Sequence, residues 1–176
     1  RKLVPEFRLP RGEGRSVERF NAVIATGAAL RLNRVEVGPD DLAFLQYTGG
    51  TTGLSKGAML LHRNVVANIL QSEAWFQPML ERVGHRALTT VCALPLYHIF
   101  AFTVGMMLSL RTGGQQVLIP NPRDLPAVLK ELARHRIHSF PAVNTLFNGL
   151  ANHPDFALVD WSHLKISVGG GMAVQS

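Results

Sequence analysis

The chain has 176 residues, of which 47% are hydrophobic and 17% are charged, so its composition excludes a disordered segment and is typical of a folded domain. Its formal net charge is +6, from 18 basic and 12 acidic residues. The basic residues are scattered along the sequence, which argues against nucleic acid as a partner, although the excess positive charge suits acidic ligands or an anionic membrane surface. The single cysteine, Cys92, excludes an internal disulfide framework and fits a reducing compartment.

Residues 16–76 contain signals for two helices and two strands. Apolar residues recur at helical spacing over positions 16–32, which predicts an amphipathic helix there. Strands are predicted up to Tyr47 and again from the following glycine-rich segment to Leu61. A helix is predicted to begin at 62–64 and to end near Phe76, because Pro78 follows and proline disfavours a helix interior.

The rest of the chain alternates between the two kinds of element. We predict strands over 87–94, 115–119, 138–140 and 164–168, and helices over 99–110, 124–134 and 143–152. Asp124 has the residue type and position of a helix N-cap, and Gly113 and Gly114 are expected to end the preceding helix. Alternating strands and helices indicate an α/β fold with a mostly parallel sheet and flanking helices.

Residues 87–110 need separate consideration because they contain no Asp, Glu, Lys or Arg over 24 positions. That length could cross a bilayer. However, Pro95, Tyr97 and His98 interrupt the stretch, and the part before Pro95 is rich in threonine and valine. We therefore predict a buried strand, a loop and a buried helix, with Cys92 as a buried structural thiol on the strand.

The segment 47–57, with the sequence YTGGTTGLSKG, is the most informative part of the chain. It combines four glycines, three threonines, one serine and one lysine in eleven positions, directly after an apolar run. Glycines allow backbone N–H groups to approach a ligand, and hydroxyls and a lysine ammonium group suit an oligophosphate. A plain solvent-exposed loop would share the glycines but would rarely combine them with the Thr51–Thr52 pair and Lys56. We therefore predict a phosphate-binding loop.

This loop differs from the usual phosphate-binding motifs. The P-loop has Gly-Lys followed by Ser or Thr at the start of a helix, whereas here Lys56 precedes Gly57 and residues 58–62 have the pattern of a strand. A dinucleotide-binding G-x-G-x-x-G turn that opens a helix is also missing at this position. The loop is therefore expected to connect two strands, as a hairpin that folds over phosphates.

Two further segments are candidates for a site. In 94–98, LPLYH, a predicted strand stops at Pro95 and presents Tyr97 and His98 at the carboxyl end of a sheet, where sites form in α/β proteins. Histidine can be neutral or charged near pH 7, although a lone histidine in a loop often has only a structural role. In 167–172, SVGGGM, three consecutive glycines permit a flat group to approach the backbone, although a simple turn would have the same sequence.

Other chemistries are not supported. The remaining histidines lack cysteine or carboxylate partners at ligand spacing, which argues against a zinc site. The sequence has no G-x-S-x-G motif, which argues against a serine hydrolase of the usual α/β type.

The motif YTGGTTG-x-x-KGA resembles the phosphate loop of the adenylate-forming enzymes. Together with LPLYHIF over 94–100, NPRD over 121–124, VNTLFN over 143–148 and VGGGM over 168–172, the chain looks like bacterial long-chain fatty acid–CoA ligases over nearly its whole length. Two positions depart from the family pattern. Gly49 stands where most relatives have serine, which removes a hydroxyl, and Ser55 replaces a frequent proline, which should loosen the loop slightly.

The resemblance implies a two-step reaction. A fatty acid and ATP give acyl-adenylate and pyrophosphate, and CoA then displaces AMP; Mg²⁺ would accompany the nucleotide. It assigns catalytic roles to Lys56 and His98, acid binding to His98 and Phe102, and Mg²⁺ binding to Thr48. It assigns nucleotide binding to the loop and to the glycine turn: Tyr47, Thr48, Gly49, Gly50, Thr51, Thr52, Gly53, Leu54, Ser55, Lys56, Gly57, Ala58, Gly169, Gly170, Gly171 and Met172. Phe100, Val104 and Met106 are further candidates for the wall of an acyl tunnel, although a core helix would use the same residues.

The resemblance also implies that residues 1–176 are a single interior piece of the large N-terminal AMP-binding domain. The small C-terminal domain with its catalytic lysine, the Mg²⁺-binding glutamate and the ribose-binding aspartate would lie outside it, so this piece alone is expected to be inactive. We expect a cytoplasmic protein, with association at the inner membrane surface left open. An aryl-acid- or amino-acid-activating domain, a nucleotide-binding module without ligase activity and an interaction domain are the alternatives.

Overall fold

The computed structural model describes residues 18–48, 56–84 and 87–172, and the chain divides into two compact units, 1–37 and 38–176. In the first unit, helix α1 (Phe20–Ala28) is shorter than the helix predicted over 16–32, and none of its residues is buried. Its apolar residues, among them Phe20, Val23 and Ile24, are exposed. The prediction of a helix is therefore confirmed over residues 20–28, although not over the whole range 16–32.

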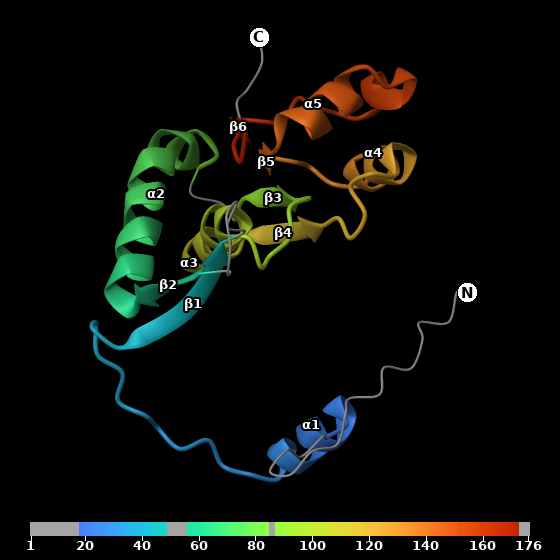
Figure 1. The fold of residues 1–176 in the computed structure, drawn as a ribbon. Coiled ribbons are helices and arrows are strands. Elements are labelled where there is room, and N and C mark those ends of the chain that lie inside the picture. The colour runs from blue at the N-terminus through green and yellow to red at the C-terminus, as the bar shows by residue number, and fades with distance from the viewer. Residues whose placement is uncertain (1–17, 49–55, 85–86, 173–176) are drawn as a thin grey trace. The chain divides into compact units, whose positions relative to one another are not determined.

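The second unit begins with an antiparallel hairpin of β1 (Leu42–Thr48) and β2 (Lys56–Leu61) (Figure 1). A turn precedes it, in which the Asp41 carboxylate accepts a hydrogen bond from the Gly38 N–H at 2.7 Å. The register shifts between Leu42 and Phe44, so Ala43 forms a bulge near the start of β1. The prediction that the phosphate loop joins two strands is confirmed, although loop residues 49–55 lie outside the described residues.

Helix α2 (His62–Arg82) starts where the sequence predicts but runs well past the predicted end at Phe76. The Asn64 side chain accepts a hydrogen bond from the Leu61 N–H at 2.9 Å, which satisfies a donor at the start of the helix. Pro78 lies inside the helix and removes one backbone hydrogen bond. Phe76, Met79 and Leu80 are buried around it, and their packing keeps the last turns helical. The prediction that Pro78 ends the helix is wrong.

The main sheet has four strands in the order β4-β3-β5-β6, and all of its pairs are parallel. Its strands are β3 (Thr89–Cys92), β4 (Gln115–Leu118), β5 (Ser139–Ala142) and β6 (Ile166–Gly169). The predicted α/β fold with a mostly parallel sheet is confirmed. Strands β3 and β5 are buried throughout, whereas β4 is an edge strand on which only Val117 is buried, so the strand expected over 115–119 forms but is not the short buried strand that its apolar residues suggest.

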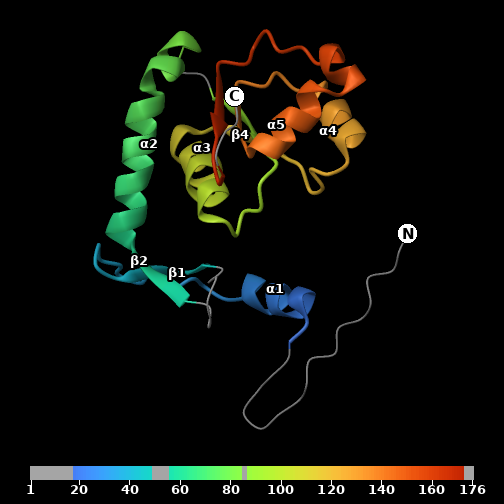
Figure 2. The same cartoon turned by 45° about the horizontal axis from the view of Figure 1, so that its top comes forward.

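The connections place helices on both faces of the sheet (Figure 2). After β3, a π-helix η1 (Ala101–Met107) leads into α3 (Leu108–Thr112), and Gly113 ends it with a positive φ of 70°. After β4 comes α4 (Leu125–Leu132), and Asp124 caps it by accepting from the Ala127 N–H at 3.1 Å, as predicted. After β5 come α5 (Asn144–Ala151) and a short 3₁₀ helix η2 (Pro154–Leu158).

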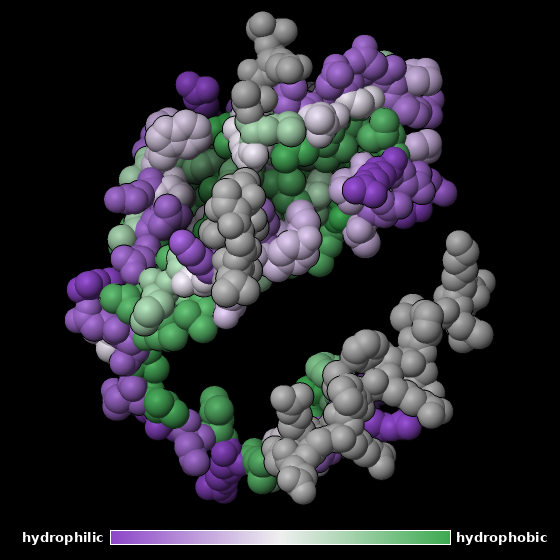
Figure 3. Space-filling view, in the orientation of Figure 1, coloured by the Kyte–Doolittle hydropathy of each residue, from purple (hydrophilic) through white to green (hydrophobic). Residues whose placement is uncertain are grey.

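Two hydrophobic clusters lie against the sheet. The larger includes Val91 and Phe140 of the strands with residues of α4 and α5, and the smaller joins Phe76, Leu80 and Leu108 of α2 and α3. Hydrophobic surface also remains visible over the hairpin and in the region of α4 and α5 (Figure 3). An apolar hollow of about 350 Å³ is lined by Phe140, Phe147, Leu150, Ala151, Phe156, Trp161, Leu164 and Ser167.

The stretch without charges over 87–110 folds as β3, a loop, η1 and the start of α3, so the predicted order of strand, loop and helix is confirmed, although the helical part is buried only on one side and Leu110 is exposed. In the described part of the chain, no helix combines the length and the apolar character needed to cross a membrane. Cys92 is buried on β3, and burial raises the pKa of its thiol above the usual value, so it is mainly protonated at neutral pH. This agrees with a structural role for Cys92.

His138 joins three parts of the sheet near the start of its strands. Its N–H donates to the Thr89 carbonyl at 2.9 Å, its carbonyl accepts from the Lys165 N–H at 2.9 Å, and its ring Nδ1 accepts from the Thr89 N–H at 3.0 Å. That last bond requires an unprotonated Nδ1. Burial, followed by the nearby charges of His163 and Lys165, lowers the pKa of His138.

This arrangement predicts a loss of stability in acid. The unfolded chain takes up a proton on His138 as the pH falls through about 6.5, whereas the folded chain resists protonation until its lower pKa, so the free energy of unfolding decreases over that window. Urea unfolding at pH 8 and at pH 5 measures the decrease. In His138→Asn the side-chain oxygen can still accept from Thr89 but does not titrate, so the decrease should be smaller. Equal decreases in the two proteins would contradict the prediction.

Candidate functional site

The hairpin brings together the two described ends of the predicted phosphate loop. Tyr47 pairs with Gly57 and Thr48 pairs with Lys56, so Lys56 lies at the first position of β2, directly after the loop. The Tyr47 ring covers Gly57, where an added Cβ would come within 3.3 Å of the ring. Ala58 pairs with Gln46 one step further along the strands. The predicted residues from Gly49 to Ser55 lie outside the described residues, so their assigned roles stay predictions.

The segment with His98 follows β3 at the carboxyl end of the parallel sheet, as the sequence indicates. Its backbone forms a turn in which the His98 N–H donates to the Pro95 carbonyl at 2.9 Å. His98 is exposed, and its Nδ1 accepts a hydrogen bond from the Phe100 N–H at 3.2 Å. This bond fixes the ring orientation and leaves Nε2 as the atom that would meet a ligand.

The helix after His98 is a π-helix, whereas the sequence predicts an ordinary apolar helix over 99–110. The Thr103 hydroxyl donates to the Ile99 carbonyl at 2.9 Å, and this carbonyl is the acceptor that the Thr103 backbone N–H would use in a regular α-helix. Segments of π-helix are frequent at functional sites. Ala101, Thr103 and Gly105 of this helix are buried, whereas Phe102 is only half-buried.

The glycine turn lies next to the His98 segment. Strand β6 ends at Gly169, the Gly170 N–H donates to the Ala142 carbonyl at 3.2 Å, and Gly171 has a φ of 78°. An added Cβ on Gly170 would lie 2.9 Å from the Phe100 ring, so only glycine permits this approach. Met172 is half exposed, at 50%. The structure therefore brings the glycine turn and the His98 segment together through Phe100.

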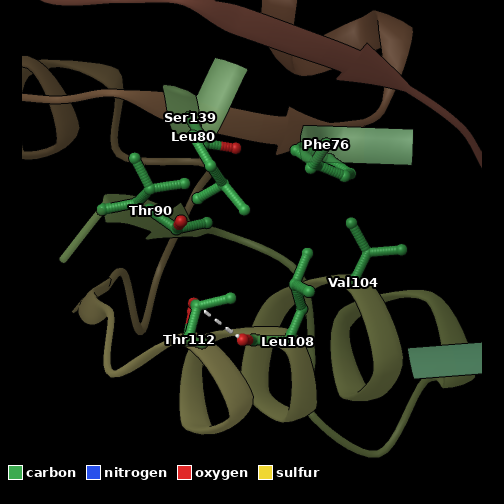
Figure 4. A pocket seen from close by; sticks show the side chains of 9 residues that line it. Phe76, Leu80, Thr90, Val104, Leu108, Thr112 and Ser139 are labelled. Atoms are coloured by element: carbon green, nitrogen blue, oxygen red, sulfur yellow. Dashed lines mark hydrogen bonds between the residues drawn. The ribbon is translucent and has the colours of Figure 1, made fainter. Parts of the chain in front are cut away.

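Of the residues considered for an acyl tunnel, Val104 lines a narrow space between α2, α3 and the sheet (Figure 4). Phe76, Leu80 and Leu108 are among its other lining residues, and Thr90, Thr112 and Ser139 add hydroxyl groups. The space measures about 10 Å³, which is at most the size of one water molecule. A fatty chain would fit there only if these side chains moved.

Phe102 instead contacts the hairpin. Its ring packs edge to face against Phe44 of β1, with centroids 4.6 Å apart and an angle of 69° between the planes. Beside this contact, the Gln46 side chain donates to the Tyr97 carbonyl at 3.2 Å. Sequence reasoning missed Phe44 and Gln46. The alternation of side chains along the strand before the loop could have indicated them, because it places Phe44 and Gln46 on the same face of the strand.

The position of Phe102 leads to a test of its predicted role in binding the acid. In the full-length protein, Phe102→Ala should change the ratio of kcat/KM between long and short acids by at least about fivefold, because hydrophobic pockets discriminate by about 1–3 kcal/mol per methylene. The half-buried ring should make the loss of thermal stability modest. A chain-length series of kcat/KM beside a thermal melt measures both. An unchanged ratio with a large drop in Tm would assign Phe102 to the core.

Comparisons with known proteins identify the family to which this arrangement belongs. The sequence matches the AMP-binding enzyme family over residues 9–176. The chain belongs to this family. A solved member, MatB from Rhodopseudomonas palustris with ATP bound, superposes with a TM-score of 0.68 at 27% identity, covering 85% of this chain and 28% of MatB. The α/β architecture predicted from the sequence is therefore that of an AMP-binding enzyme.

Individual relatives are more closely similar. The chain is 47% identical over 175 residues to the long-chain-fatty-acid–CoA ligase of Escherichia coli O6:H1, covering 99% of this chain and 30% of that protein. It is 47% identical over 176 residues to the long-chain-fatty-acid–CoA ligase of Salmonella typhimurium, covering 100% of this chain and 30% of that protein. The chain therefore spans about 30% of the length of these curated relatives.

The described part of this AMP-binding chain does not form a metal site by itself. Among residues 18–48, 56–84 and 87–172, no group of three or more His, Cys, Asp or Glu could hold a metal ion. Mg²⁺ in proteins is usually held by one or two carboxylates together with substrate phosphates. A threonine hydroxyl such as that of Thr48 would supply at most one neutral ligand to such a site.

Proposed function

We propose that this chain is the phosphate- and acid-binding part of a long-chain fatty acid–CoA ligase. In the first step, a fatty carboxylate oxygen bonds to the α-phosphorus of ATP while the bond to pyrophosphate breaks. In the second, the CoA sulfur bonds to the acyl carbon, AMP leaves with the bonding electrons, and the thiol proton is released. The observation that carries the proposal is 47% identity to long-chain-fatty-acid–CoA ligases along essentially the whole chain.

The geometry supports a division of roles among the motifs. Lys56, at the start of β2, would place its ammonium group beside the phosphates and stabilise the negative charge of the departing pyrophosphate. His98, held through Nδ1, would direct Nε2 toward the carboxylate or the α-phosphate. Gly169, Gly170 and Gly171 would allow the adenine ring to lie against the backbone. These groups act by positioning and charge stabilisation, on which phosphoryl chemistry largely depends.

The test is single-turnover formation of acyl-adenylate by the full-length protein with ATP and palmitate, followed by thioester formation on addition of CoA. Long-chain acids should be activated in preference to benzoate or amino acids. If an aryl acid or an amino acid is activated in preference to palmitate, the proposal of a long-chain fatty acid as the substrate is wrong. ATP binding without any adenylate would indicate a nucleotide-binding module that lacks ligase activity.

A further inference from the structure

The amide of Gln46 connects two segments that are far apart in the sequence. Its Nε2 donates to the carbonyl of the neighbouring Tyr47 at 3.3 Å and to the carbonyl of Tyr97, 51 residues away, at 3.2 Å. Glutamine has two N–H donors on this nitrogen, so one side chain can serve both carbonyls. The Gln46 side chain is half-buried, whereas Tyr47 and Tyr97, whose carbonyls it meets, are exposed.

A second contact lies two residues earlier on the same strand. Phe44 and Gln46 share one face of β1, because side chains alternate along a strand. The Phe44 ring meets Phe102 with centroids 4.6 Å apart. The two contacts therefore hold β1 against positions 97 and 102.

His98 lies within the segment that these contacts hold. It directly follows Tyr97, and its carbonyl accepts the Phe102 N–H at 3.0 Å. On the other side, β1 continues to Thr48, which pairs with Lys56. The Gln46 amide thus connects the strand pair that presents Lys56 with the turn that presents His98.

We propose that Gln46 is a positioning residue that sets the distance between the phosphate-binding hairpin and the acid-binding turn. The inference rests on the proposed function, in which ATP is bound at the hairpin and the fatty carboxylate at His98. Attack on the α-phosphorus requires both to be held in a near-attack arrangement, and small displacements reduce the rate strongly. ATP would contact the hairpin and the fatty acid would contact the His98 turn. Loss of the Gln46 hydrogen bond to Tyr97 should therefore lower the rate of the reaction between the two substrates more than it weakens the binding of either one.

A structural role alone would give a different result. One hydrogen bond from a half-buried amide adds little to net stability. Removal of the Gln46 amide should therefore leave the thermal melt nearly unchanged. The diagnostic observation is a fall in the single-turnover rate at saturating ATP and palmitate without an equal loss of ATP affinity.

The experiment compares Gln46→Leu and Gln46→Glu in the full-length protein. Gln77→Leu is the matched control, because the Gln77 amide also makes a side-chain hydrogen bond but to Glu81 on α2. We expect Gln46→Leu to slow acyl-adenylate formation by about tenfold with the Kd of ATP changed by less than about twofold, and Gln77→Leu to match the unmodified protein. Gln46→Glu should be slower still at pH 8, because its carboxylate would face two carbonyl oxygens.

The pH dependence of Gln46→Glu provides a second readout. Carbonyl oxygens facing the carboxyl group favour its protonated form, which can donate to one of them. The rate of Gln46→Glu relative to the unmodified protein should therefore rise as the pH falls from 8 to 6. A rate for Gln46→Leu within about twofold of the unmodified protein would overturn the inference, as would parallel losses of rate, ATP affinity and Tm. If the unmodified protein forms no acyl-adenylate, the proposed function itself is wrong. That result differs from failure of the Gln46 inference alone, in which the unmodified protein is active and Gln46→Leu is equally active.

Discussion

Replacing Lys56 with alanine in the full-length protein is expected to slow acyl-adenylate formation by at least about tenfold, equivalent to about 1.4 kcal/mol of lost transition-state stabilisation. Lys56 is the only Lys, Arg or His within residues 47–57. The hairpin places it opposite Thr48, at the end of the loop predicted to hold the phosphates. In Lys56→Ala, the loop would therefore have no cationic side chain to stabilise the negative charge that develops on pyrophosphate.

The measurement is the single-turnover rate at saturating ATP and palmitate. Lys130→Ala is the matched control, because Lys130 is an exposed lysine on the last turn of α4 and should leave the rate unchanged. Lys56→Arg should recover part of the rate, since it keeps the charge but changes the shape of the donor group. Acyl-adenylate formation by Lys56→Ala at the unmodified rate would show that Lys56 is not part of the phosphate site.

The second large effect is expected on stability. Phe140 lies on the central strand β5 with only 2% of its surface exposed, and its ring meets Phe147 with centroids 5.3 Å apart. Large-to-small substitution of a buried phenylalanine costs about 3–5 kcal/mol. Phe140 also borders the apolar hollow of about 350 Å³. We therefore expect Phe140→Ala to lower the free energy of unfolding by about 3–4 kcal/mol.

Urea unfolding followed by far-UV circular dichroism measures this loss. Phe140→Leu is the conservative comparison, because it keeps much of the apolar volume and should lose clearly less stability. A loss below about 1 kcal/mol for Phe140→Ala would show that the cluster between β5, α4 and α5 contributes little to stability.

Local signals in the sequence determined many features directly. The glycine and hydroxyl residues between two apolar runs predicted a strand–loop–strand, and the pairing of β1 with β2 confirms it. Asp124 predicted a helix start because its short carboxylate can accept an N–H of the first turn, and it does so. The break at Pro95 predicted that His98 would lie at the carboxyl end of a buried strand, where the structure places it. Each of these depends on residues within a few positions of one another.

Tertiary contacts decided the rest. Pro78 should have ended α2, but burial of Phe76, Met79 and Leu80 outweighed its local preference. Phe102 is half-buried and packs against Phe44, which lies 58 residues earlier in the sequence. The Gln46–Tyr97 bond likewise joins residues 51 positions apart. Sequence patterns reveal which face of a strand or helix a residue occupies, but the partner of that face depends on how the elements pack together, which short-range propensity does not encode.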